Sequence, residues 1–334
     1  MESKQPEVLN YLGVSAIVLF LGFSFFAVLD GVFVFSNEVF GAASSTVTAS
    51  TTVVVGNAAP TVNSVTLNNG SAITLTPNAT TTIYVSAQIA DNNGCTDLQN
   101  GTTTILVYRS GYTSSTCLTT SSNLSCYRVT TFSASSTCTG GGTSVDTTSS
   151  VDIYYFADST ENAGTATSTY PAQNWLATVI FKDPSNATGS RDSSGVEVNV
   201  LLAINITTSS INYDTMSASS TSGSTNQVTT STNAGNSTSS LQIRANSTLT
   251  SGSNSIPTSS QKYATSSFNY DTSTTTVAIT DTTTPITGTT MVTPTSTTNV
   301  SKTVFWGLTI PAGTATGTYS GVNLFTARYV DVAN

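Results

Sequence analysis

The 334-residue chain has no histidine, and only 8% of its residues carry a charge. Histidine is the side chain that ordinarily titrates near neutral pH, so its absence excludes a Ser-His-Asp arrangement and removes the most common nitrogen ligand of zinc. The nine lysines and arginines form no cluster, which excludes the dense phosphate contacts that a nucleic acid requires. These absences argue against an enzyme and against a nucleic-acid partner.

Hydrophobic residues nevertheless make up 38% of the chain, which is enough apolar surface for a packed core. Serine and threonine dominate the remainder, whereas strong helix formers are scarce after the first few dozen positions. Threonine, valine, isoleucine and the aromatic residues favour pleated strands. The composition therefore predicts an all-β protein.

A predominantly apolar stretch runs from Leu12 to Leu29. At helical rise it spans about 27 Å, close to the roughly 30 Å hydrocarbon core of a bilayer. We interpret residues 1–43 either as a signal peptide, cleaved after Gly41 or Ala43, or as a retained membrane-anchor helix. Residues 44–58 follow as a spacer rich in Thr, Ser and Val. Both interpretations predict that the rest of the chain is extracellular or on the cell surface.

The chain has four cysteines, all within one short window: Cys95, Cys117, Cys126 and Cys138. An even number in an exported chain predicts two disulfides. Three pairings are possible and the spacing does not decide between them; we expect Cys117–Cys126 nested inside Cys95–Cys138. A zinc site is the alternative, but the paired short spacings typical of zinc ligands are absent.

Residues 59–204 show the alternation of about seven or eight strands separated by turns, which is typical of a β-sandwich. The Asn69–Gly70 dipeptide predicts a hairpin turn. Period-two alternation predicts that two strands each bury one face, the first with Ile83, Val85, Ala87 and Ile89 and the second with Trp175, Ala177, Val179 and Phe181. The segment "GVEVNVLLAI" (195–204) predicts the last strand of this domain.

Residues 205–334 predict a second, smaller sandwich rich in Thr and Ser. The Thr-rich stretch 272–298 is too monotonous for strands and predicts a long loop or partial disorder. Near the end, "VFWGLTI" predicts a strand with Val304, Trp306, Leu308 and Ile310 on its buried face. With "PAGTATG" as the turn and "VNLFTARYV" as its partner, it predicts a closing hairpin.

One corner of the first domain carries oxygen ligands in a pattern that suits calcium. In "IADNNGCTDL", Asp91, Asn93 and Asp97 alternate around a glycine. The distal glutamate of a calcium-binding EF-hand loop is missing, and Asp and Asn also favour turns through bonds to the backbone. Calcium is the one candidate cofactor, and we expect no other.

Two further patterns have both a functional and a structural interpretation. Asp158 and Glu161 could pair with Asp183 or Asp192 as the carboxylates of a glycoside hydrolase, but aspartates after strands also form turns. The tryptophans Trp175 and Trp306 and the Tyr154–Tyr155 pair could stack on sugar rings, but aromatic residues in strands usually fill the core. We expect the structural interpretation in both cases.

Several segments resemble a known group of proteins. They are "APTVNSVTLNNGSAITLTP", the "IADNNGCTDL" corner, "IYYFAD", "WLATVIFKD" and "VFWGLTIPAGTATGTYSGVNLFTA". Together they are similar to exported Ig-like β-sandwich surface proteins of ultrasmall candidate-phylum (Patescibacteria-type) bacteria, over most of residues 59–328. The resemblance implies a cell-surface location and two Ig-like antiparallel sandwiches. It carries over no catalytic or binding residue, because a fold by itself does not specify an activity.

These observations predict a non-enzymatic exported surface protein with a structural or adhesive role in the cell envelope. The expected partners are other surface proteins or glycans, a second copy of the chain in an oligomer or lattice, and the membrane if the N-terminal helix is retained. A carbohydrate- or ligand-binding module is the first alternative, and a secreted hydrolase is the second.

Overall fold

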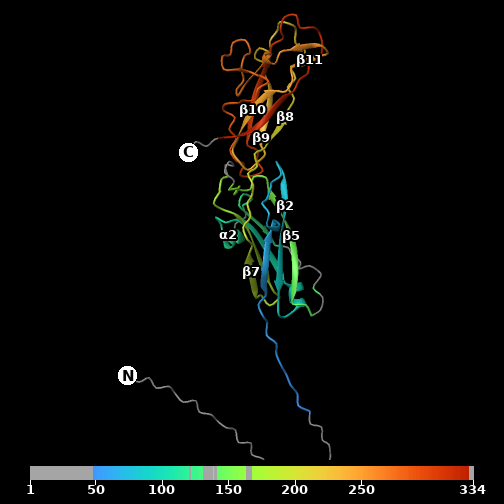
Figure 1. Ribbon diagram of the computed structural model, residues 1–334, viewed down its shortest axis with the longest axis vertical. Coiled ribbons are helices and arrows are strands. Elements are labelled where there is room, and N and C mark those ends of the chain that lie inside the picture. The colour runs from blue at the N-terminus through green and yellow to red at the C-terminus, as the bar shows by residue number, and fades with distance from the viewer. Residues whose placement is uncertain (1–47, 120–121, 131–137, 139–140, 163–167, 331–334) are drawn as a thin grey trace, which may run out of the picture. The chain divides into compact units, whose positions relative to one another are not determined.

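The computed structural model describes residues 48–119, 122–130, 138, 141–162 and 168–330 (Figure 1). The apolar run Leu12–Leu29, and with it the expected signal peptide or anchor over 1–43, lies outside these residues. Within the described ranges, no helix is long and apolar enough to cross a membrane. The chain divides into two compact units, Met1–Val54 and Val55–Asn334, and the strands and helices described below all belong to the second.

The described residues are organised mainly as antiparallel strands, which confirms the all-β class. The α-helices within the described ranges are two six-residue elements, α1 (Cys95–Asn100) and α2 (Ser114–Thr119). The strands fall into a first group, β1–β7, and a second group, β8–β17, and no sheet contains strands of both. In Figure 1 the first group runs from blue to green and the second from yellow to red.

The first group forms two antiparallel sheets with a common core. The three-stranded sheet has the order β1 (Thr61–Leu67), β2 (Thr80–Ala90), β5 (Ser144–Tyr154). The four-stranded sheet has the order β4 (Cys126–Val129), β3 (Thr102–Arg109), β6 (Trp175–Lys182), β7 (Thr188–Asp192). Buried residues of both sheets, Ile83 and Trp175 among them, belong to one apolar cluster, so the two sheets pack face to face.

The β2–β5 pair shows how the sequence gives this layer two different faces. On β2 the predicted set Ile83, Val85, Ala87 and Ile89 is buried. On the opposite face, side chains of β2 bond across to β5, as in Thr82 to Asp152 at 2.5 Å and Gln88 to Asp146 at 3.0 Å. On this exposed face, which has few charges, the hydroxyl, amide and carboxylate groups thus form hydrogen bonds with one another in cross-strand pairs.

The second group repeats the arrangement with different strand numbers. Its five-stranded sheet has the order β14 (Val277–Ala278), β13 (Gln261–Ala264), β16 (Ser301–Leu308), β9 (Gln227–Asn233), β8 (Ile204–Thr208). Its three-stranded sheet has the order β15 (Thr284–Pro285), β10 (Ser239–Ala245), β17 (Asn323–Tyr329), and β11 (Leu249–Ser251) pairs with β12 (Asn254–Ile256). The Trp306 ring on β16 meets the Phe325 ring on β17 at 6.0 Å, edge to face, across the core.

The predicted closing hairpin is wrong, although its buried face is correct. Val304, Trp306, Leu308 and Ile310 are all buried. However, β16 pairs with β9 and β13, whereas β17 pairs with β10 in the other sheet. The segment between them therefore crosses from one sheet to the other, because both strands bury an aromatic face against the same core.

Two other turns and strands also differ from expectation. Asn69–Gly70 lies in a short 3-10 turn (Asn68–Gly70), and β1 does pair with β2, but the connection continues to Thr80 because Ile73 and Leu75 are buried on the way. The segment 195–204 forms no regular strand before Ile204. It makes only isolated bridges, in which Val196 meets Trp175 and Val198 meets Ile73.

The Thr-rich stretch 272–298 is a long irregular loop with two short strands, β14 and β15. Three apolar side chains, Ile279, Ile286 and Met291, are buried in the core of the second group and hold the loop against it. Because these three residues are far apart in a monotonous sequence, they form no periodic pattern from which their burial could be predicted.

Each group contains one tryptophan, and both indoles are fully buried with their N–H groups bonded. Trp175 Nε1 donates to the Asp158 carbonyl at 2.8 Å, and Trp306 Nε1 donates to Thr229 Oγ1 at 2.9 Å. Burial of this kind excludes both rings from stacking on a sugar.

The two tryptophans give a separate optical probe of each group. Trp175→Phe leaves only Trp306, and Trp306→Phe leaves only Trp175. We expect blue-shifted emission from each single-tryptophan protein and resistance to quenching by acrylamide, because both rings are shielded from water. Emission that is red-shifted or readily quenched in the native protein would contradict the corresponding core.

Candidate functional site

The corner after β2 is built by a side chain that bonds to its own turn. Asp91 directly follows β2, and its Oδ1 accepts a hydrogen bond from the Asn93 backbone N–H at 2.8 Å. The Asp91 carbonyl accepts from Gly94 N–H at 3.1 Å. Gly94 has φ +92°, a conformation that favours glycine, and it caps the start of α1. This turn places Asp97, in the first turn of α1, next to Asp91.

Asn93, the middle residue of the predicted calcium set, has another role. Its Oδ1 accepts from the Ala58 N–H at 2.6 Å, and its Nδ2 donates to the Gly56 carbonyl at 3.2 Å. Both ends of the amide therefore hold the leading segment 56–58, which enters β1. Asn93 positions that segment and does not point its oxygen at the two aspartates.

The third carboxylate at this corner comes from a distant part of the chain. Asp183 follows β6, and its ligand oxygen lies within 4.8 Å of those of Asp91 and Asp97. Its Oδ1 accepts from Ala187 N–H and its Oδ2 from Asn57 Nδ2, both at 2.8 Å. The structure thus brings together Asp91 and Asp97 as expected and replaces Asn93 by Asp183. We call these three residues the acidic corner.

The acidic corner concentrates negative charge in a largely buried place. Asp91 is 2% exposed and Asp183 is 3% exposed. Two unit charges 4.8 Å apart repel by about 3.5 kcal/mol at an effective dielectric constant near 20. Among the described residues no lysine or arginine forms an ion pair with any of the three. The Oδ2 atom of Asp91 is buried and has no hydrogen-bond partner among the residues that the structure describes.

The four cysteines form two disulfides that fasten the short helices. Cys95, the first residue of α1, is bonded to Cys138, and Cys117 of α2 is bonded to Cys126 at the start of β4. The Cα–Cα distances are 5.6 and 5.7 Å, within the usual range for disulfides. This is the nested arrangement. The Cys95–Cys138 bond anchors the helix that carries Asp97.

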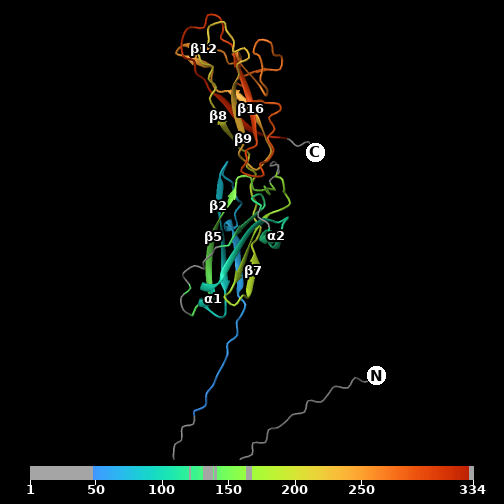
Figure 2. The ribbon, with the colours of Figure 1, turned by 180° about the vertical axis from the view of Figure 1, so that it is seen from behind.

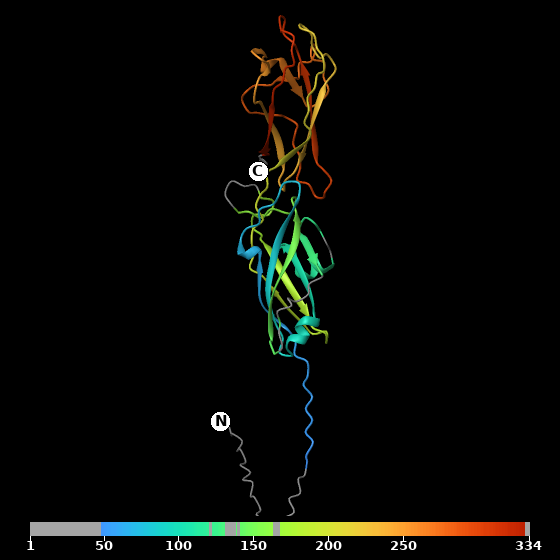
Figure 3. The ribbon, with the colours of Figure 1, turned by 90° about the vertical axis from the view of Figure 1, so that its right-hand side faces the viewer.

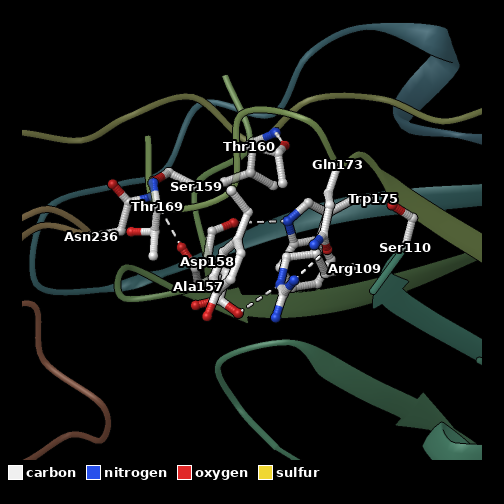
Figure 4. A network of polar contacts seen from close by, with 12 residues as sticks. Arg109, Ser110, Ala157, Asp158, Ser159, Thr160, Thr169, Gln173, Trp175 and Asn236 are labelled. Atoms are coloured by element: carbon white, nitrogen blue, oxygen red, sulfur yellow. Dashed lines mark hydrogen bonds and ion pairs between the residues drawn. The ribbon is translucent and has the colours of Figure 1, made fainter. Parts of the chain in front are cut away.

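A second polar cluster surrounds Arg109 at the end of β3 (Figure 4). Its Nε donates to Asp158 Oδ2 at 2.9 Å, and its Nη1 donates to Gln173 Oε1. The guanidinium lies 3.4 Å from the centroid of the Tyr170 ring. Because the cation is 5% exposed and each of these groups is engaged, the cluster is a packed polar core that fastens the loops around β3 and β6.

Burial is the dominant influence on Asp158. Desolvation raises the pKa of the Asp158 carboxyl above its ordinary value, while the hydrogen bond and the charge of Arg109 act in the opposite direction. The ion pair therefore only partly offsets the cost of removing the carboxylate from water. We attribute to this pair the orientation of the loops and not a net gain in stability.

The predicted pairing of Asp158 with Asp183 as the carboxylates of a glycoside hydrolase is not assembled. The backbone carbonyl of Asp158 accepts a hydrogen bond from Trp175 Nε1 at the beginning of β6, whereas Asp183 follows the end of the same strand. Eight residues of strand separate the two positions by about 23 Å, more than twice the separation that either hydrolytic mechanism uses.

Asn236 is a buried residue of the second group that bonds to the chain of the first (Figure 4). Its Nδ2 donates to the carbonyls of Ala157 at 3.0 Å and Asn199 at 3.1 Å, and its Oδ1 accepts from Leu201 N–H at 2.6 Å. It is 0% exposed. All of its amide bonds therefore go to backbone that would otherwise be left unsatisfied, and sequence alone gave no sign of this role.

The second group contains a cavity of about 830 Å³ beside the crossing segment between β16 and β17. Its walls include Tyr213, Tyr319 and Phe325 together with the amides of Gln261 and Asn323. Gln261 links the polar side, because its Nε2 donates to Tyr213 Oη at 3.1 Å and its Oε1 accepts from Asn323 at 2.8 Å. Burial raises the pKa of the Tyr213 hydroxyl, so this group stays protonated and acts as a hydrogen-bonding group.

Comparison with known proteins yields no relative from which a role could be transferred. No protein-family model matches the chain, and no curated protein is similar to it at a significant level.

Two Asn-Ser-Thr sequences provide a matched test of the buried amide. Asn236→Ala removes three hydrogen bonds and leaves backbone groups buried without partners, so we expect the free energy of unfolding to fall by about 3 kcal/mol or more. Asn246→Ala changes an exposed residue in the same local sequence, and we expect a change within about 0.5 kcal/mol. Urea unfolding followed by tryptophan emission measures both, and equal losses in the two variants would contradict the role of Asn236.

Proposed function

We propose that the chain is a non-enzymatic protein exported to the cell surface, with a structural or adhesive role in the cell envelope. Its working part would be two Ig-like β-sandwich domains, corresponding to residues 59–204 and 205–334, behind an N-terminal export or anchor segment. The observation that carries the proposal is the pair of disulfides within a β-layered chain.

The disulfides support the location. Structural disulfides persist in oxidising compartments outside the cytoplasm and are rare within it. Cys117 and Cys126 are buried between α2 and β4, and Cys95 and Cys138 fasten α1. Both bonds stabilise surface elements that contribute few apolar contacts of their own, which is what an exported domain requires.

The polar side chains support a role without chemistry. Asp158 is paired with Arg109, and Asp158 and Asp183 lie near opposite ends of β6. The exposed face of the β2–β5 pair consists of hydroxyls, amides and carboxylates bonded to one another, with Tyr84 as its exposed aromatic residue. Such a surface suits contact with other surface proteins or glycans.

Two tightly packed cores support the division into two domains. Trp175 is at the centre of the first core and Trp306 at the centre of the second, and the sheets of the two groups share no strand. The face-to-face layers of antiparallel strands are the arrangement that Ig-like sandwiches adopt.

The location is tested by adjacent cysteine substitutions in the loop before β16. Val292 is 59% exposed and Met291 is 0% exposed. We expect Val292→Cys to react with a membrane-impermeant maleimide on intact cells and Met291→Cys to react only after denaturation. Labelling of Val292→Cys that requires cell lysis would contradict a surface location.

The cavity of the second group favours a second candidate function, the binding of a carbohydrate or similar ligand. A concave site with aromatic walls and a few convergent amides and hydroxyls is typical of ligand pockets. Tyr213, Tyr319 and the Gln261–Asn323 pair would provide the contacts.

A glycan array with the purified protein separates the two functions. The structural or adhesive role predicts ordered assemblies or cell attachment by the purified protein, and no glycan signal that depends on the cavity. A specific signal that Tyr319→Ala abolishes, and that the exposed control Tyr84→Ala retains, would establish the binding module instead.

A further inference from the structure

Three carboxylates in the first group meet in one place, and no lysine or arginine of the described part of the chain forms an ion pair with them. Asp91 leaves the end of β2, Asp97 lies in α1 and Asp183 follows β6, and their ligand oxygens lie within 4.8 Å of one another. Figures 2 and 3 show α1 beside the blue segment that leads into β1. Like charges this close disfavour the folded state unless a positive group joins them.

The hydrogen bonds at the acidic corner show which oxygen is available. Asp183 uses both oxygens to accept bonds from Ala187 and Asn57, and Asp91 uses Oδ1 for Asn93. Asp91 is 2% exposed, and its buried Oδ2 accepts no hydrogen bond from any described residue. A buried carboxylate oxygen costs free energy when nothing bonds to it, so its position here points to a ligand.

We propose that Asp91, Asp97 and Asp183 bind one calcium ion. Calcium prefers carboxylate oxygens, accepts six to eight ligands at about 2.3–2.6 Å and tolerates irregular geometry. Two oxygens on the same calcium ion therefore lie at most about 5 Å apart, which the spacing at the acidic corner satisfies without a rearrangement. Asp97 is partly exposed, so the ion can enter from solvent and retain water as further ligands.

Calcium at this position also stabilises the path of the chain into the first sheet. Asn93 and Asn57 tie the leading segment 56–58 to the same turn and to Asp183. The Cys95–Cys138 disulfide holds α1 and with it Asp97. The bound ion therefore joins the ends of β2 and β6 to the point where the chain enters β1. This inference does not depend on the proposed function.

Calorimetric titration of the full-length protein with calcium tests the site. We expect one ion to bind per chain, with a dissociation constant near the roughly 10⁻⁴–10⁻³ M typical of extracellular modules. Asp91→Asn and Asp183→Asn each remove a ligand charge and should abolish the saturable heat. Asp152→Asn removes an exposed carboxylate on β5 of the same group and should retain it.

A second variant and a second measurement distinguish the loss of calcium binding from misfolding. Asp97→Asn changes a partly exposed residue and should also lose the saturable heat while keeping native tryptophan emission. In the wild type, calcium should raise the melting temperature and slow elastase cleavage after Ala58, and both effects should disappear in Asp97→Asn.

Three results would overturn the proposal. The first is no saturable heat in the wild type at millimolar calcium. The second is binding that survives in a natively folded Asp91→Asn, Asp97→Asn or Asp183→Asn protein. The third is an equal response to magnesium, which would indicate general neutralisation by divalent cations and not a site suited to calcium.

Discussion

The burial of alternate side chains between facing sheets is the constraint on which the rest of this structure depends. Strands such as β2, β6 and β16 have one apolar face each, and that face leaves water only when an opposing sheet covers it. Trp175 and Trp306 occupy the centres of the two cores, and each bonds its N–H inside the protein. Because each core closes around its tryptophan, the polar faces and the connecting loops are free to differ in sequence.

The loops, which have little apolar area, are held in other ways. Two disulfides fasten the short helices, Arg109 ties the loops around β3 and β6, and Asn236 satisfies backbone groups near the start of the second group. In each of these places the polar atoms have partners within the protein. The acidic corner differs, because it leaves a buried oxygen and three negative charges without compensation from the described residues. A site that the protein does not satisfy by itself is the place where a ligand adds most to stability.

Sequence patterns predicted the features that depend on neighbouring residues. The all-β class, the buried face of β2, the buried face of β16 and the mostly irregular Thr-rich loop all follow from local periodicity or composition. Features that depend on residues far apart in the sequence could not be predicted from such patterns. The predicted closing hairpin is wrong because β17 pairs with β10 in the opposite sheet. The segment 195–204 forms no regular strand before Ile204, and its bridges go to Trp175 on β6 and to Ile73 in the connection before β2. At the acidic corner, Asp91 and Asp97 share a turn and were predicted together. Asp183 follows a different strand, β6, and this position after a buried strand was the only sequence signal for its role.

The bonds Cys95–Cys138 and Cys117–Cys126 fasten α1 and α2 to the β-layers, and the proposed location depends on them. Peptide mapping of native material, alkylated before digestion and analysed without reduction, tests this most directly. We predict two cross-linked peptide pairs with that connectivity and no alkylated cysteine. Four alkylated cysteines would contradict both the location and the anchoring of α1 and α2, whereas a different pairing would contradict the anchoring alone.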